Sequence, residues 1–243
     1  MVTVDFQYGT LVLAGPETEL APVQSWCSYD ERVAGWRAEA MAYGPIILAL
    51  RAAGVPCEDR AKAFRPLELR LEDTRTARDY QAEALDAWER TLRRGVVVLP
   101  TGAGKSLVAR LAILRVQRPT LVVVPTLDLV EQWVRQLHAG FGVEVGVLGG
   151  GERSVGDLTV ATYDSALLTM EFHGNRFGLL VVDECHHLPG PTTQHLARMC
   201  IAPFRLGLTA TPERDDGAEA LLRGLIGPIC YRREIDELEG DVL

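Results

Sequence analysis

Two different hydrophobic patterns divide the chain near residue 72. The first segment mixes short alternating apolar–polar stretches with one longer apolar stretch, which is typical of a small α+β domain over residues 1–72. The Gly44–Pro45 pair would break a helix in that longer stretch into two. We expect two strands joined by a turn at Gly9 over residues 3–15, and then one helix or a broken helix over residues 31–55. A further strand is expected over residues 65–73.

The second pattern, over residues 73–243, has a different rhythm. It opens with an amphipathic helical stretch that ends at Gly95. Apolar runs then recur at intervals, each followed by a turn and a helical stretch, and continuous Val/Leu runs of this kind predict a parallel sheet covered on both faces. We therefore expect an α/β fold for this part. The predicted strands lie at residues 95–100, 120–125, 158–162, 179–184 and 204–211.

Composition narrows the class of protein without deciding its ligand. The 243 residues are 47% hydrophobic, enough for one large domain or two modest ones, and the net charge of −8 leaves room for a local basic groove. The five cysteines include no C-x-x-C pair, so neither a disulfide framework nor a zinc ribbon is expected. No signal peptide and no run of about 20 apolar residues is present. We expect a cytoplasmic protein with no membrane contact.

A glycine-rich turn follows the first strand of the second segment. Residues 100–106 read Pro-Thr-Gly-Ala-Gly-Lys-Ser between a predicted strand and a predicted helix, which is the setting of a phosphate-binding loop. Its glycines allow successive N–H groups to point at a phosphate, and the helix start adds its positive dipole end. Lys105 is one of only two lysines, beside Lys62. Its compact ammonium would sit between the β- and γ-phosphates, where the fork of an arginine has a different geometry.

This loop predicts an ATP site with Mg²⁺, in which Ser106 gives its hydroxyl to the metal. Leu99 stands where the usual motif opens with glycine, so a glycine-rich turn without a ligand is the alternative. The residues of the loop predicted to bind ATP are Leu99, Pro100, Thr101, Gly102, Ala103, Gly104, Lys105 and Ser106.

A pair of carboxylates follows another buried strand. Asp183 and Glu184 end the run 179–184, and ligands of open α/β sheets bind at the carboxyl ends of the strands. We assign Asp183 to Mg²⁺ and Glu184 to the role of general base on the attacking water, with the strand ending at about residue 183. The neighbouring His186 and His187 match no zinc pattern with cysteine partners, so a polar link to the next strand is the favoured interpretation.

Three motifs together carry a family resemblance: "PTGAGKS", "DECH" and the "TAT" of Thr209, Ala210 and Thr211. In this order they resemble the first motor domain of superfamily 2 helicases, which implies a RecA-like P-loop fold. The segment 78–85 resembles the Q motif of that superfamily, which implies that Gln81 reads adenine, assisted by Arg78. Lys105, Asp183 and Glu184 are then the catalytic residues.

Within the superfamily, the sequences "DECHHLP" and "APFRLGLTATPERDDG" resemble the motifs of the archaeal-type XPB family of DNA repair and transcription helicases. The first 72 residues also resemble the damage-recognition domain of that family. The family has Arg-Glu-Asp where this chain has Arg214, Asp215 and Asp216, which puts strand separation by that motif in question. Cys185 replaces the more usual valine of the family motif.

The resemblance also implies contacts with DNA, single-stranded or forked. Backbone N–H groups and hydroxyls would hold phosphates, so no large basic patch is required. Trp26, Trp36 and Tyr43 could stack on bases, although core packing is favoured for them. The predicted DNA-binding residues are Pro125, Thr126, Leu127, Gly149, Gly150, Thr162, Tyr163, Arg214, Asp215 and Asp216. The predicted coupling residues between the ATP and DNA sites are His186, Thr209, Ala210 and Thr211.

No motif for a second motor domain follows Thr211. We therefore expect the N-terminal half of a nucleoid-associated, ATP-dependent DNA helicase or translocase that hydrolyses ATP weakly on its own, with a nuclease as the partner that the family suggests. Two alternatives stay open. One is another superfamily 2 translocase, such as a restriction-enzyme motor subunit, and the other is a non-catalytic DNA- or protein-binding module.

Overall fold

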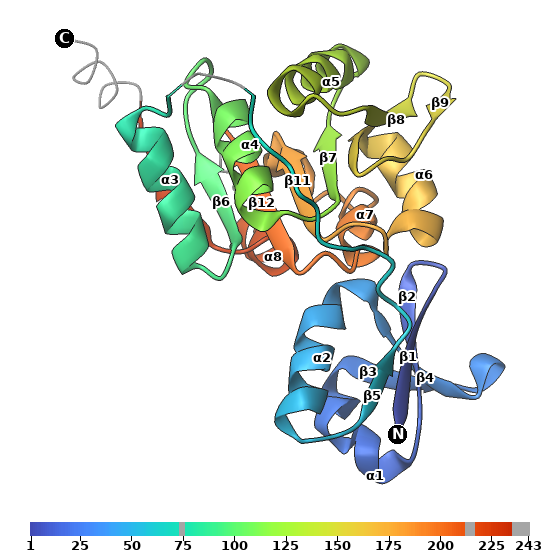
Figure 1. Cartoon of the computed structure of the whole chain (residues 1–243). Helices are drawn as coiled ribbons and strands as arrows, with labels where there is room; N and C mark the ends of the chain where they lie inside the picture. The colour runs from blue at the N-terminus through green and yellow to red at the C-terminus, as the bar shows by residue number, and fades with distance from the viewer. Residues whose placement is uncertain (73–75, 212–216, 235–243) are drawn as a thin grey trace.

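The computed structural model describes residues 1–72, 76–211 and 217–234. Within these ranges the chain forms two β-sheets, one of five strands and one of eight (Figure 1). The smaller sheet belongs to the N-terminal domain, and the larger sheet with its helices forms the second domain. Arg214, Asp215 and Asp216, which we predicted to contact DNA, lie outside the described residues.

The N-terminal sheet has the order β3-β4-β2-β1-β5, in which β1 pairs antiparallel with β2 and parallel with β5. The predicted hairpin is confirmed, since its turn falls at Tyr8 and Gly9. Val2, Val4 and Leu11 on this sheet pack against Ile46 of the helix α2. The elements are β1 Val2–Gln7, β2 Thr10–Ala14, α1 Glu17–Leu20, β3 Cys27–Asp30, β4 Gly35–Glu39, α2 Tyr43–Ala52 and β5 Cys57–Asp59.

The helix predicted over residues 31–55 is wrong in its first half. Gly35–Glu39 is the strand β4, which pairs antiparallel with both β2 and β3. Pairing with a strand on each side outweighs the helical spacing of its apolar residues. The reason is that β4 forms hydrogen bonds with both neighbouring strands, whereas a short helix is only marginally stable by itself. The Gly44–Pro45 pair does not break a helix either, because α2 begins at Tyr43 and the proline sits in its first turn.

The strand predicted at residues 65–73 is also absent from the described part of that segment. Residues 60–72 run without regular structure along the second domain, and α3 begins only at Asp79. The segment is held instead by Gln117, whose carbonyl accepts from the Leu67 N–H and whose side chain bonds both main-chain groups of Leu69. Its alternation therefore reflects contact with a domain surface on one side and solvent on the other, without a neighbouring strand.

The large sheet has the order β13-β6-β12-β11-β7-β10-β8-β9, and every pairing in it is parallel except that of β8 with β9. All five predicted strands of the second pattern are confirmed. Three short strands at the two edges of this sheet were missed: β8, β9 and β13. The strands are β6 Arg94–Val98, β7 Thr120–Val124, β8 Val145–Gly149, β9 Glu152–Arg153, β10 Leu158–Thr162, β11 Leu179–Asp183, β12 Phe204–Thr209 and β13 Ile229–Arg232.

Helices cover both faces of this sheet, as the continuous apolar strands predict (Figure 1). Successive residues of a strand face opposite sides, so Val97 packs under α3, α4 and α5 while Val96 and Val98 pack under α6, α7 and α8. The parallel strands thus end at one common edge, where the turns that follow them meet. The helices are α3 Asp79–Arg90, α4 Lys105–Val116, α5 Leu127–Phe141, α6 Tyr163–His173, α7 Gln194–Arg198 and α8 Ala218–Leu225.

The two domains touch through apolar packing and through specific polar contacts. Glu39 of β4 forms a 2.6 Å ion pair with Arg198 of α7. The side-chain amide of Asn175 donates to the Ala61 carbonyl, and the Asn175 carbonyl accepts from the Ala63 N–H. The N-terminal domain is therefore seated against α6 and α7, at the end of the large sheet where the strands begin (Figure 1).

Candidate ATP and DNA site

The glycine-rich turn joins the end of β6 to the start of α4. Gly104 adopts the left-handed conformation, with φ 77°, directly before Lys105 opens the helix. The Lys105 ammonium donates to the main-chain carbonyls of Leu99, at 3.1 Å, and Pro100, at 3.4 Å. It thus lies over the turn rather than in solvent. The geometry matches the predicted phosphate loop, with a positive side chain and a helix N-terminus at one place.

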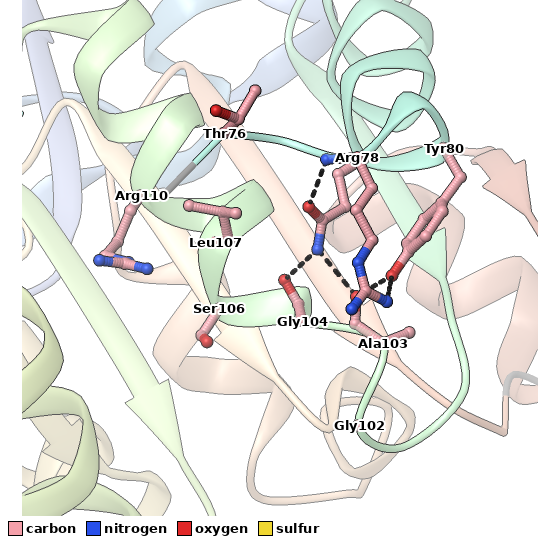
Figure 2. A pocket seen from close by; sticks show the side chains of 10 residues that line it. Thr76, Arg78, Tyr80, Gly102, Ala103, Gly104, Ser106, Leu107 and Arg110 are labelled. Atoms are coloured by element: carbon pink, nitrogen blue, oxygen red, sulfur yellow. Dashed lines mark hydrogen bonds between the residues drawn. The ribbon is translucent and has the colours of Figure 1, made fainter. Parts of the chain in front are cut away.

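Side chains from the start of α3 close one side of this loop (Figure 2). The Gln81 amide donates to the Ala103 carbonyl at 2.9 Å and accepts from the Arg78 N–H at 3.0 Å. The Tyr80 hydroxyl donates to the same Ala103 carbonyl at 3.0 Å and lies 3.3 Å from the Arg78 guanidinium. Together with Gly102 they border a cavity of about 330 Å³. Gln81 and Arg78 therefore lie beside the glycine-rich turn, on one side of this cavity.

Tyr80 was missed by the sequence analysis. The signal was available, because it stands between two residues of the recognised motif, but an aromatic residue at a helix start is usually core. Its ring is indeed buried. Its hydroxyl donates to the Ala103 carbonyl of the loop, which also accepts a hydrogen bond from the Gln81 amide. The loop is thus held to α3 by two side chains instead of one.

The acidic pair lies at the end of β11, as predicted. Trp133 of α5 donates its indole N–H to Asp183 at 2.9 Å, and the Glu184 N–H donates to the other carboxylate oxygen at 3.1 Å. Burial raises the pKa of Asp183, opposed by the Trp133 hydrogen bond and by the nearby Lys105 ammonium. Trp133 was not predicted as a site residue, because fifty positions separate it from Asp183 and no local pattern links them.

Residues of the loop and of the acidic pair fit ATP with Mg²⁺ on three observations. A buried Asp183 with a raised pKa lacks a full countercharge, which a divalent cation would supply. A side chain added at Gly102 would meet nothing within 4 Å, so the tip of the loop opens on free space. The hydroxyl of Ser106 lies in the first turn of α4, bordering the same cavity. Among the residues that the structure describes, no three His, Cys, Asp or Glu side chains gather as ligands of one metal ion.

A turn at Glu184 leads from the acidic pair to the next strand. Glu184 adopts a left-handed conformation with φ 47°, unusual for a residue with a side chain. Its carboxylate lies 3.4 Å from His186, whose Nδ1 is 2.9 Å from the Thr209 hydroxyl at the end of β12. The Thr211 N–H donates to that same hydroxyl, with Ala210 between the two threonines. The four predicted coupling residues thus form one connected group with Glu184.

Tyr163 faces the same turn and not the surface. Its hydroxyl donates to the main-chain carbonyls of Asp183, at 3.0 Å, and Glu184, at 3.1 Å. The side chain is 6% exposed. A direct contact of this side chain with DNA, as the resemblance implied, is therefore not available in this conformation, and its role is turned towards the acidic pair.

The remaining described candidates for DNA binding gather at the starts of α5 and α6. Thr126 and Thr162 cap these helices by accepting from main-chain N–H groups at 3.4 and 3.2 Å. A side chain added at Gly149 would contact both Leu127 and Thr162, so β8 ends between the two helix starts. Pro125 precedes Thr126, and Gly150 adjoins Leu127. Two helix N-termini thus face one glycine turn.

The candidates for base stacking in the N-terminal domain differ from one another. Tyr43 is buried, and its hydroxyl donates to Asp59 at 2.6 Å. Trp36 packs on the domain core with its ring edge-on to Tyr29. Trp26 is 42% exposed and borders a groove between the two domains. Core packing therefore accounts for the first two.

Comparison with known proteins decides the family. Residues 74–214, more than half of the chain, match the family described as type III restriction enzyme, res subunit. Residues 4–61 match the xeroderma pigmentosum group B helicase damage recognition domain. The chain belongs to the XPB family of superfamily 2 helicases. The match of the first domain to a helicase domain favours this family over the restriction-enzyme motor kept as an alternative.

The XPB relatives include a DNA 3'-5' translocase XPB2 of Sulfurisphaera tokodaii, 48% identical over 70% of this chain and 38% of the relative. A putative DNA 3'-5' helicase Rad25 of Halobacterium salinarum is 35% identical over 75% of this chain and 31% of the relative. The chain thus spans about a third of the length of these relatives. Membership of this helicase family implies ATP-dependent activity.

Solved structures support the fold of the XPB chain. The crystal structure of the UvsW helicase from bacteriophage T4 aligns with a TM-score of 0.51 and 17% identity, covering 95% of this chain and 99% of that one. The likeness extends over both domains, which agrees with the order of domains described above. None of the helices in the described ranges is both long and apolar enough to cross a membrane.

Proposed function

We propose that this chain is the ATP-binding and DNA-gripping part of an XPB-type DNA 3'-5' translocase, comprising a damage-recognition-like domain over residues 1–72 and a first motor domain over residues 73–243. The observation that carries the proposal is the glycine-rich turn at the end of β6, where Gly104 is left-handed and the Lys105 ammonium lies over the turn, at the same edge of the sheet as Asp183 at the end of β11. A cation on the glycine-rich loop and a carboxylate two strands away in the sheet then frame one site.

Each residue of the site has a proposed role. Lys105 and the loop N–H groups from Gly102 onward bind the β- and γ-phosphates, and Ser106 with Asp183 holds Mg²⁺, which neutralises phosphate charge when bound. Glu184 orients the attacking water and accepts its proton. Gln81, with Arg78, reads the adenine edge next to the loop that they contact.

The decisive test is calorimetric titration with Mg²⁺–ATP. Lys105→Ala should weaken binding at least tenfold, because it removes the cation from the phosphates. Lys62→Ala is the matched control, since Lys62 is the other lysine of the chain and lies in the N-terminal domain. Equal affinity of the two variants, or no heat with wild type, would remove the basis of the proposal.

Turnover by this chain alone is expected to be slow. The family resemblance implies that arginines of a second motor domain complete the site, and an arginine of that kind is worth roughly 10³–10⁵ in rate. Steady-state ATPase with and without DNA measures this. Robust DNA-stimulated hydrolysis by these 243 residues would contradict the requirement for a second domain.

DNA would be held at the starts of α5 and α6. Helix N-termini and a glycine turn supply N–H donors to phosphates without a basic patch, as a tracking strand requires. Gly150→Asp should weaken binding of fluorescein-labelled forked DNA, because it adds a negative charge there. Gly54→Asp is the matched control, since both glycines have similar φ, 60° and 68°, and Gly54 has open space around it in the N-terminal domain. Equal anisotropy curves would count against this surface.

The group formed by His186, Thr209 and Thr211 is proposed to couple ATP hydrolysis to movement. It links Glu184, just after β11, to the end of β12 through the 3.4 Å contact of Glu184 with His186 and the hydrogen bonds of Thr209, which a nucleotide could strengthen or release. In the longer protein, Thr209→Ala with Thr211→Ala should leave ATPase intact and reduce translocation. Unchanged translocation would count against coupling. A nuclease partner and a place beside the chromosome follow from the family and stay predictions.

A further inference from the structure

A broad groove lies between the two domains, with a volume of about 830 Å³. Its N-terminal wall comes from α2 and the turns before it, and its other wall from the end of α3 and the starts of β6 and β12. Those strands begin here and end at the ATP site, so the groove lies at the opposite edge of the large sheet. Trp26, Leu48 and Leu92 line it and are 42%, 64% and 84% exposed.

The exposure of three bulky apolar side chains around one groove is unusual for a soluble surface. Pro45 and Met41 continue the apolar wall on the N-terminal side, and Phe204 continues it on the other. When the groove is empty, its apolar side chains are exposed to water. Apolar side chains of a bound segment would displace that water, and the burial of apolar surface would lower the free energy. It has the shape and chemistry of a site for a protein segment.

The charged residues of the groove are paired, with one exception. Glu39 forms its ion pair with Arg198, and Arg93 forms a 3.1 Å ion pair with Glu89 while its guanidinium lies over the Phe204 ring. Arg94 lines the same groove but has no ion pair and no side-chain hydrogen bond within the described parts of the chain. Burial lowers the pKa of Arg94, which shows that its charge is partly removed from water.

A partly desolvated cation without a partner is costly, and a carboxylate brought to it would be held by a charge-assisted hydrogen bond. We propose that the groove between the domains binds a short segment of a partner protein in which bulky apolar side chains flank one carboxylate that pairs with Arg94. Nucleic acid is disfavoured here, because Glu39 and Glu89 also border the groove. This inference does not depend on the ATP site.

A segment bound in this way would contact both domains at once. Trp26 and Leu48 belong to one domain, while Leu92 and Arg94 belong to the other. The bound segment would therefore add contacts to those that already join the domains and hold the N-terminal domain in place relative to the motor domain. The bound partner would thereby set the orientation of the damage-recognition-like domain relative to the motor domain.

Selection of a random 12-residue peptide library displayed on phage against the purified chain tests this. We expect enriched peptides with two or more bulky apolar residues around an aspartate or glutamate. Synthetic fluorescein-labelled copies should bind wild type, lose at least tenfold in affinity with Arg94→Gln, and lose affinity again with Leu48→Ser. Arg135→Gln is the control, because Arg135 is exposed on α5, away from the groove, and should bind like wild type.

Each other outcome contradicts the proposal. Failure to enrich any peptide family, enriched peptides without an acidic residue, or equal binding to wild type and Arg94→Gln would each overturn it. Competition by Mg²⁺–ATP would place the peptides at the wrong edge of the sheet. Because Leu48 is exposed, Leu48→Ser should fold normally, as circular dichroism can verify, so the test survives if Arg94→Gln does not fold.

Discussion

The hydroxyl of Tyr163 donates to the main-chain carbonyls of both Asp183 and Glu184, at 3.0 and 3.1 Å. This one atom ties the start of α6 to the turn that carries the acidic pair. The turn needs such support, because Glu184 is in a left-handed conformation that costs roughly 1 kcal/mol for a residue with a side chain. The start of α6 and the turn of the acidic pair are therefore joined by a buried hydrogen bond.

Tyr163→Phe should destabilise the chain while keeping the ring in place. Buried carbonyls lose a donor, at a cost of about 1–2 kcal/mol, equivalent to a fall in melting temperature of roughly 2–8 °C. Tyr29→Phe is the control, because Tyr29 is exposed and its hydroxyl has no described partner. A melting temperature unchanged in both variants would show that the hydroxyl does not support the turn. In the longer protein we expect kcat to fall more than KM rises.

Two glycines of the phosphate loop offer a matched pair. Gly102 and Gly104 have similar φ, 83° and 77°, so alanine strains the backbone equally at both, by about 1 kcal/mol. A side chain at Gly104 would also collide with the Gln81 amide, whereas at Gly102 it meets nothing within 4 Å. Gly104→Ala should therefore displace Gln81 and cost about 1 kcal/mol more than Gly102→Ala.

A double-mutant cycle in urea checks this. Gly104→Ala combined with Gln81→Ala should be less destabilising than the sum of the two, because the collision is gone. Gly102→Ala combined with Gln81→Ala should be additive. Additivity in both cycles would show that Gln81 does not rest against the loop in solution.

The buried carboxyl of Asp183 predicts opposite pH effects on stability and on ligand binding. Its pKa is raised in the folded chain, chiefly by burial, so the folded state takes up a proton at higher pH than the unfolded chain. Ionised Asp183 therefore costs stability above the raised pKa, and that cost is relieved as the pH falls through it towards about 4. Binding of Mg²⁺–ATP should weaken over the same range, because the proton competes with the metal.

Thermal unfolding of wild type and Asp183→Asn between about pH 7 and pH 4 measures the first effect. The stability of wild type relative to the variant should rise as the pH falls, without ligand. With Mg²⁺–ATP the stabilisation of wild type should shrink over that interval. A pH-independent difference without ligand would mean that Asp183 has an ordinary pKa.

Arg205 predicts a large purely structural effect. It is fully buried in β12, and its guanidinium donates at 2.7–3.1 Å to four main-chain carbonyls, two in the helices α7 and α8 and two in the segment that precedes β12. Arg205→Met would leave these carbonyls unpaired, at roughly 3 kcal/mol or more. Arg135→Met, which breaks an exposed pair with Glu131, should cost about 0.5 kcal/mol or less. Urea denaturation of both variants measures the difference, and equal midpoints would contradict it.

Local chemistry was enough to predict the central strands and the turn from β6 into α4. Short continuous Val/Leu runs that are each followed by a turn and a helical stretch favour strands buried on both faces, and glycines before a lysine at a helix start are typical of a phosphate-binding loop. The edge strands β8, β9 and β13 were missed because they are short and half-exposed. Residues 35–39 were assigned to a helix because their apolar spacing fits one, whereas β2 and β3 pair with them.

The sequence by itself determined the α/β class, the family resemblance and the places of the glycine-rich turn and the acidic pair, since these depend on spacing within one strand, turn and helix. Only the tertiary structure decided which distant side chains complete the site. Trp133 and Tyr163 reach the acidic pair from helices far along the chain. Likewise, only the folded structure shows that Arg94 lines a groove between the domains and has no ion-pair partner among the described residues. The physical reason is that burial and pairing depend on neighbours brought together by folding, which no local pattern records.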